Sequence, residues 1–163
     1  MKTLIVLLFF SFGVSAQKDC DHTRQRFSCV KFIRNYDGDT LTFDLPGVHS
    51  FFGEGAKVRV KGIDTPELKP RGEAAPCETE WGRVAKKLVE AELKTAKVIH
   101  LTGLSGLDKY GRILAQVEYD GKNLSDVLLK NKLAVPYVGK KKIKVNWCDQ
   151  KNKREKGHGT KAI

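Results

Sequence analysis

Short stretches of alternating hydrophobic and polar residues recur along the chain, and this is the pattern of β-strands that bury one face. The clearest is 57–63, where Val58, Val60 and Ile63 are separated by polar residues or glycine. Asp-Gly pairs at 37–38 and 120–121 are typical of turns. The pattern predicts strands over residues 28–35, 40–45, 57–63, 97–102 and 112–119.

Apolar residues recur at helical spacing between the third and fourth predicted strands, over 78–94, and predict the main amphipathic helix. Asn123 can cap a second, short helix after the fifth strand. Strands and helices in this order fit a small closed barrel, and the OB-fold is the best-known nucleic-acid-binding barrel of that size. We therefore predict an α+β, mainly β fold: a five-stranded OB-fold barrel with two to three helices.

Residues 1–16 have the pattern of a secretory signal peptide. A basic Lys2 precedes an apolar run at 4–12, and small residues follow at 13–16. The apolar run has about half of the roughly 20 residues that a spanning helix needs. We expect cleavage before Gln17, which leaves 17–163 as one domain with a basic C-terminal tail, in a secreted or periplasmic protein.

The four cysteines of an exported chain are expected to form disulfides. Their spacing does not resemble that of a zinc site. Of the possible pairings we favour Cys20–Cys29, which would tie the N-terminal arm to the first strand, and Cys77–Cys148, which would pin the C-terminal region to the start of the helix.

The chain is basic, with 30 Lys and Arg against 19 Asp and Glu, a net charge of +11 and a pI near 9.6. Such a charge favours an anionic partner, which can be nucleic acid, lipopolysaccharide or an acidic membrane, although lysines can also serve solubility alone. The basic runs at 140–144 and 151–161 carry too little apolar surface for insertion. We therefore expect no stable membrane association.

Three polar clusters stand where predicted strands end: DGDT at 37–40, an arginine followed by DTPE within 59–67, and DKYGR at 108–112. The first suits a hairpin turn, but its two carboxylates also suit a hard cation such as Ca2+. In the second, strand alternation puts Arg59 and Asp64 on opposite faces unless the backbone twists or bulges near Gly62. The third can be a solvated loop or a basic fork that reaches a phosphate.

Taken together, in this order, the three motifs resemble those of the staphylococcal nuclease (thermonuclease) family. The resemblance covers residues 29–137. It implies a Ca2+-dependent phosphodiesterase on an OB-like barrel, with DNA and RNA as substrates, little sequence preference and 3′-phosphate products.

The resemblance also implies a Ca2+ site. By motif position, the carboxylates of Asp39 and Asp64 and the backbone carbonyl of Thr65 would bind Ca2+ directly. Asp37 would lie in the outer shell and contact metal-bound water.

Catalytic and substrate-binding roles follow in the same way. Glu67 matches the general base, and Arg59 and Arg112 match the two guanidinium groups that clamp the reacting phosphate. Arginine suits that role because its planar fork donates parallel hydrogen bonds and stays charged. The substrate-binding residues would be Lys109, Tyr110 and Tyr137.

Two other functions remain possible on the sequence. A nucleic-acid-binding barrel that has lost catalysis would bind without cutting, and a cationic structural protein would bind envelope polyanions without metal-dependent turnover. The enzyme is favoured because the carboxylates and arginines of all three motifs are present together. We expect a monomer.

Overall fold

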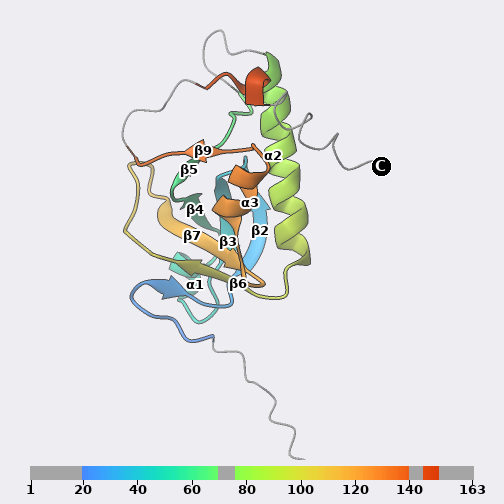
Figure 1. Cartoon of the computed structure of the whole chain (residues 1–163). Coiled ribbons are helices and arrows are strands. Elements are labelled where there is room, and N and C mark those ends of the chain that lie inside the picture. The colour runs from blue at the N-terminus through green and yellow to red at the C-terminus, as the bar shows by residue number, and fades with distance from the viewer. Residues whose placement is uncertain (1–19, 70–75, 140–144, 151–163) are drawn as a thin grey trace, which may run out of the picture.

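A computed structural model describes residues 20–69, 76–139 and 145–150 (Figure 1). The expected signal peptide at 1–16, the basic run at 140–144 and the basic tail from 151 lie outside these residues.

Most strands belong to one curved sheet with the order β1-β6-β7-β4-β3-β2, in which β8 pairs with β7. All of its pairs are antiparallel except β4 with β7, which is parallel. A second, two-stranded sheet pairs β5 with β9. The strands are β1 Arg26–Phe27, β2 Lys31–Asn35, β3 Thr40–Asp44, β4 Ala56–Val60, β5 Ile63–Asp64, β6 Ile99–Thr102, β7 Ile113–Tyr119, β8 Lys122–Asn123 and β9 Val135–Pro136.

The curved sheet returns on itself. The backbone N–H of Val30, just before β2, donates to the carbonyl of Ile99 in β6 at 2.9 Å. β2 is the last strand in the sheet order, so this bond links that edge back to β6. The strands β2, β3, β4, β7 and β6 thus form the predicted α+β, mainly β, OB-fold.

The helices of the structure are α1 Ser50–Gly53, α2 Pro76–Thr95 and α3 Leu124–Lys130. The long helix α2 lies along β2 (Figure 1). In α3 the predicted cap is present, because the side chain of Asn123 accepts from the N–H of Ser125 at 2.9 Å. A further helical turn covers 147–150.

The core lies inside the barrel and under the helices. Alternate residues of β3 and β4, such as Leu41, Phe43, Val58 and Val60, point into it. Trp81 of α2 is buried there too, and its Nε1–H donates to the carbonyl of Lys132 at 3.0 Å. Trp81 is therefore a core residue.

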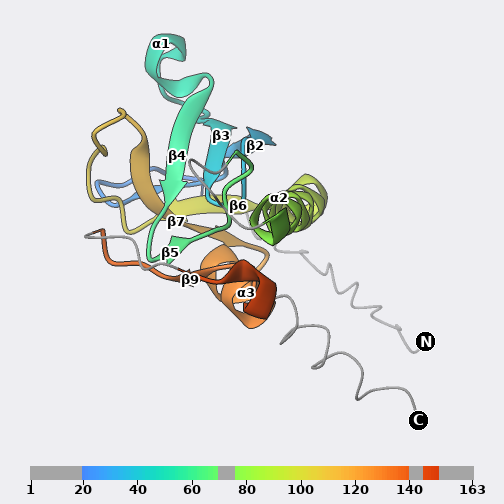
Figure 2. The same ribbon diagram turned by 90° about the horizontal axis from the view of Figure 1, so that it is seen from above.

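Besides the short strands β1 and β8, which were not predicted, the structure departs from the predicted elements in three places. The strand predicted over 57–63 is broken by a turn at 61–62, where Gly62 has φ of +82°. The stretch between the second and third predicted strands contains α1, which is capped by His49 and protrudes beyond the barrel at the end of the β3–β4 hairpin (Figure 2). β9 forms where the sequence pattern is irregular, because it completes the pairing of β5.

Both favoured disulfides are present. Cys20 pairs with Cys29 and Cys77 with Cys148, with Cα atoms 5.3 and 5.2 Å apart. The second joins the first turn of α2 to the helical turn at 147–150. In the part of the chain that the structure describes, no helix is long and apolar enough to cross a membrane.

Candidate active site

The DGDT motif forms the connection between β2 and β3. One oxygen of Asp37 accepts from the backbone N–H groups of Asp39 at 3.0 Å and of Thr40 at 2.7 Å. These bonds fix the turn and the position of Asp39. At Gly38, an added Cβ would lie 2.8 Å from Cγ2 of Thr65, so the glycine lets the turn approach the DTPE segment closely.

Arg59 connects the two carboxylates of the first and second motifs. Its Nη1 lies 3.0 Å from Oδ2 of Asp39, and its Nη2 donates to Oδ1 of Asp64 at 3.1 Å. The turn at Gly62 makes this geometry possible because it reverses the side-chain direction after β4. Thr65 completes the cluster, since its backbone N–H and its hydroxyl both donate to Oδ2 of Asp39 at 2.9 Å.

The cluster has more negative than positive charge. Asp37, Asp39 and Asp64 are all buried, and the guanidinium of Arg59 pairs with Asp39 and Asp64. The pKa of Asp39 is raised from 3.8 to about 7. Burial is the largest cause and the charges of Asp37 and Asp64 add to it, whereas the charge of Arg59 acts in the opposite direction. A bound cation would relieve this imbalance.

The donor set fits a hard divalent cation, which prefers carboxylate, carbonyl and water oxygens. Asp39 of the turn before β3, Asp64 at the end of β5 and the backbone carbonyl of Thr65 would supply the protein oxygens. Within residues 20–69, 76–139 and 145–150, no three His, Cys, Asp or Glu side chains are arranged to hold a metal ion by themselves. Binding would therefore need carbonyl and water ligands beside the carboxylates.

Arg112 directly precedes β7, and its side chain is held by Asp108. Its Nε and Nη2 contact Oδ2 of Asp108 at 2.7 and 2.6 Å. Burial raises the pKa of Asp108, but hydrogen bonds from the backbone and side chain of Arg112 outweigh it, so that pKa lies below its ordinary value. The Nη1 of Arg112 donates to the hydroxyl of Thr40 at 2.9 Å. Thr40 pairs with Arg59 across β3 and β4, so the two arginines flank it.

Aromatic rings accompany both arginines. The Cζ of Arg59 lies 5.9 Å from the ring centroid of Tyr137, and that of Arg112 lies 5.4 Å from the ring of Tyr110. Lys109 places its Nζ 5.0 Å from the Tyr110 ring. The backbone N–H of Tyr137 donates to the carbonyl of Gly62 at 2.9 Å, which brings this distant residue to the site.

Glu67 is positioned by α2. Its backbone N–H donates to Oε1 of Glu78 at 3.2 Å. Helix α2 approaches this segment closely at Gly82, where an added Cβ would lie 2.8 Å from the carbonyl oxygen of Pro66 and 3.1 Å from that of Glu67. Neither Glu78 nor Gly82 was predicted as a site residue from the sequence. Gly82 could have been noticed in the sequence, because a glycine inside a long amphipathic helix often marks a position of close packing.

Replacing Gly82 with alanine is expected to destabilise the protein, although alanine favours a helix by about 1 kcal/mol. The added methyl group would overlap backbone atoms of the segment that carries Glu67, and overpacking of this kind costs about 1–3 kcal/mol. The melting temperature should therefore fall, whereas Arg83→Ala at the exposed neighbouring position should leave it nearly unchanged. A higher melting temperature for Gly82→Ala would show that the helix does not pack this closely.

Comparison with known proteins gives consistent matches. Residues 57–157 match a family model described as staphylococcal nuclease homologue. The SPbeta prophage-derived endonuclease YokF and the endonuclease YncB of Bacillus subtilis are each 34% identical to this chain, over 77% and 67% of it and 40% and 48% of their own lengths. The thermonuclease of Staphylococcus intermedius is 29% identical, over 80% of this chain and 73% of its own. The chain thus spans less than half of each Bacillus relative.

Proposed function

Since the chain belongs to the staphylococcal nuclease family, we propose that it is a Ca2+-dependent nuclease that hydrolyses phosphodiester bonds of DNA and RNA and leaves 3′-phosphate ends. The observation that carries this proposal is the placement of Arg59 and Arg112 on either side of Thr40, beside the buried carboxylates of Asp39 and Asp64. Two guanidinium groups beside an acidic, oxygen-rich cluster suit a substrate that is itself an anion.

The arginines would act on the charge that develops during attack. Negative charge builds on the equatorial oxygens of the phosphate, and preorganised donors aimed at it are worth about 3 kcal/mol each. Arg112 is held at Nε and Nη2 by Asp108, so its fork has a fixed orientation. Arg59 is fixed in the same way by Asp39 and Asp64.

Glu67 is the residue that we assign as general base. It would take the proton of the attacking water, and its backbone is anchored by Glu78 at the first turn of α2. Asp39, Asp64 and the carbonyl of Thr65 would hold Ca2+, with Asp37 in the outer shell. Bound Ca2+ would supply positive charge to the phosphate and orient water. Lys109, Tyr110 and Tyr137 would hold the neighbouring phosphate and the nucleotide.

We also propose that the protein is secreted or periplasmic and acts as a monomer. The signal-peptide pattern at 1–16 supports export. The two disulfides support it as well, because such bonds persist in oxidising compartments.

The proposal is tested with purified residues 17–163, end-labelled DNA and RNA, and either Ca2+ or EGTA. We expect both nucleic acids to be cut in Ca2+, to be intact in EGTA, and to carry 3′-phosphate ends after cutting. Binding without cutting in both conditions would mean that the barrel is a nucleic-acid-binding module. Equal cutting in EGTA would exclude the Ca2+ requirement.

A further inference from the structure

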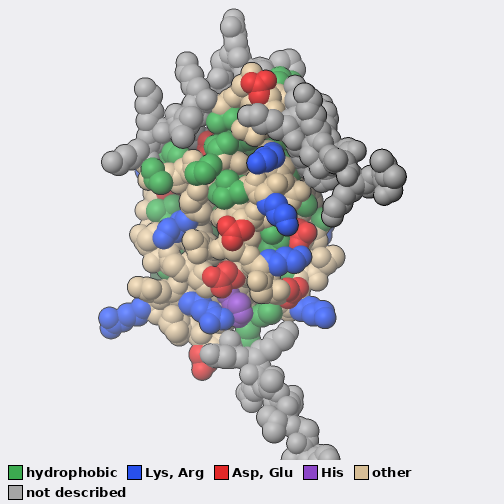
Figure 3. Space-filling view, viewed as in Figure 1, with side chains coloured by type: hydrophobic (Ala, Val, Ile, Leu, Met, Phe, Trp, Pro, Cys, Tyr) green, Lys and Arg blue, Asp and Glu red, His purple; other side chains and the backbone are tan. Residues whose placement is uncertain are grey.

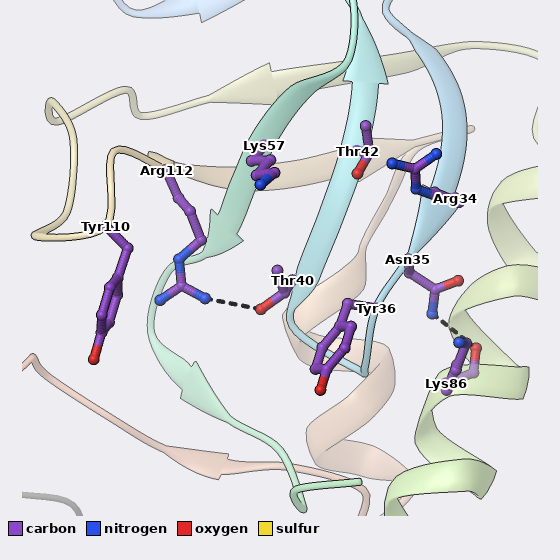
Figure 4. Close-up of a pocket in the computed structure, with 9 residues that line it drawn as sticks. All are labelled: Arg34, Asn35, Tyr36, Thr40, Thr42, Lys57, Lys86, Tyr110 and Arg112. Atoms are coloured by element: carbon purple, nitrogen blue, oxygen red, sulfur yellow. Dashed lines mark hydrogen bonds between the residues drawn. The ribbon is translucent and has the colours of Figure 1, made fainter. Parts of the chain in front are cut away.

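An open pocket of about 500 Å³ lies beside Arg112, on the outer face of β2, β3 and β4 (Figure 4). Among the described residues that line it none is acidic, and nearly half are basic. This composition differs from the face shown in Figure 3, where basic side chains are interspersed with acidic ones. The lining residues are Arg34, Asn35, Tyr36, Thr40, Thr42, Lys57, Lys86, Tyr110 and Arg112.

The basic residues follow the register of the sheet. Arg34 pairs with Thr42, and Thr42 pairs with Lys57, so these side chains form one row across three strands. Thr40 and Arg59 form the adjacent row on the same face. Two residues along a strand span about 7 Å, so Arg34 and Lys57 lie one step from the arginines of the candidate active site.

A β-bulge presents Arg34 on this face. The register of β2 and β3 shifts between Phe32 and Arg34. Phe32 packs against the core and Asn35 is buried, so the extra residue of the bulge lets both Ile33 and Arg34 face solvent. Bulges commonly redirect side chains next to functional sites. Without this one, regular alternation would turn Arg34 towards the core.

Helix α2 contributes the third cation, Lys86, which together with Arg34 and Lys57 forms what we call the basic row. The side-chain amide of Asn35 donates to the carbonyl of Lys86 at 3.0 Å and to that of Asp37 at 2.8 Å. One buried residue therefore fixes α2, the end of β2 and the DGDT turn relative to one another. This arrangement brings Lys86 to the edge of the pocket (Figure 4).

Two exposed tyrosines flank the end of the pocket nearest the site. Tyr36 is 56% exposed and Tyr110 is 70% exposed. In Figure 4 they lie on either side of the hydrogen bond from Arg112 to Thr40. Exposed aromatic rings next to a basic groove are the usual platform for stacking unpaired bases.

We propose that this pocket is a second binding subsite, which takes a phosphate and an unpaired base of single-stranded DNA or RNA next to the phosphate that is cut. Arg34, Lys57 and Lys86 bind the backbone, and Tyr36 stacks on the base. The inference rests on the proposed function, because it adds a binding step for the same substrate. The substrate that this subsite implies is a single-stranded polynucleotide longer than a dinucleotide.

The binding test compares two charge-matched triple variants. Arg34→Gln/Lys57→Gln/Lys86→Gln removes the basic row, and Lys97→Gln/Lys122→Gln/Lys130→Gln removes exposed lysines that do not line the pocket. The probes are single strands of DNA and of RNA of about 12 nucleotides, a length within the range bound by one OB-fold. Fluorescence anisotropy is measured in EGTA, where no cutting is expected, at several salt concentrations.

Removal of the basic row should raise the Kd for both single strands at least tenfold. It should also make the dependence of log K on log salt shallower by about 0.7 for each phosphate that the variant no longer neutralises. The control variant should show a much smaller change in both. Equal behaviour of the two variants would overturn the proposal.

Tyr36→Leu separates single-strand binding from general affinity for polyanions. It should weaken single-strand binding about tenfold, because one base no longer stacks, and should leave the affinity for duplex DNA unchanged. An equal weakening for duplex DNA, or none for single strands, would contradict the stacking role. With Ca2+, the preference for the long strand over a dinucleotide, measured as the ratio of kcat/KM values, should fall at least tenfold in the basic-row variant.

The two proposals fail in different ways. If the wild type cuts nothing in Ca2+ but the basic-row variant loses binding in EGTA, the nuclease proposal is wrong and the subsite remains. If the wild type cuts but both triple variants bind and cut alike, the subsite proposal is wrong and the nuclease remains.

Discussion

Replacing Glu67 with glutamine is expected to lower kcat by a factor of about 100 to 10,000, the range over which a positioned general base contributes. Glutamine keeps the size of the side chain but cannot accept the proton of the attacking water. The backbone contacts of this segment, to Glu78 and to the helix at Gly82, do not involve the carboxylate of Glu67 and should persist. The melting temperature and the Kd for DNA in EGTA should therefore stay close to those of the wild type.

The measurement is kcat at saturating DNA in Ca2+, with Glu54→Gln as the matched control. Glu54 is an exposed residue that follows α1 at the far end of the β3–β4 hairpin, so its variant loses the same charge away from the site. Undiminished cleavage by Glu67→Gln would remove Glu67 from the role of base. A parallel loss of binding would mean that the residue holds substrate instead.

The strands that carry the site could be predicted from the sequence, because the alternation of hydrophobic and polar residues that marks them is a local pattern. It also predicted that Arg59 and Asp64 could meet only if the chain changed direction near Gly62, and the turn is there. Short elements such as β9 were missed because they depend on a distant partner, here Ile63 and Asp64 of β5. Local patterns carry no information about such pairing.

The basic row was missed for a related reason. Arg34 and Lys57 are 23 positions apart, and Lys86 lies in a helix beyond both. Their association follows from a bulge and from the hydrogen bond of Asn35 to α2, neither of which leaves a sequence motif. The motifs therefore predict the residues of the candidate active site, whereas the surface that would hold the rest of the strand emerges only from the packing.

Replacing both Cys77 and Cys148 with serine is expected to lower the free energy of unfolding by about 4 kcal/mol. The disulfide closes a loop with a sequence separation of 71, and the chain entropy that such a crosslink removes from the unfolded state grows with loop length. For a protein of this size, the loss corresponds to a fall in melting temperature of roughly 8–16 °C. Thermal unfolding followed by circular dichroism measures it.

Cys20→Ser/Cys29→Ser is the matched control. Its loop has a sequence separation of only 9, so the same entropy argument gives about 2.5 kcal/mol. An equal or larger loss of stability in this control would contradict the loop-length explanation. An unchanged melting temperature in the Cys77 and Cys148 variant would show that packing alone holds the C-terminal segment.

The Cys77–Cys148 disulfide also couples the stability of the segment at 145–150 to the candidate active site. Cys148 follows Trp147, which is buried in the core, and Cys77 precedes Glu78, which binds the backbone of Glu67. Without the crosslink, the segment at 145–150 and the first turn of α2 should separate before the barrel unfolds. Trp81 lies deeper in α2 and should stay buried during this step. An early red shift in tryptophan emission would therefore report the exposure of Trp147. The value of kcat should fall over the same temperature range. Loss of kcat only together with the circular dichroism signal of the barrel would show that the two regions unfold as one unit.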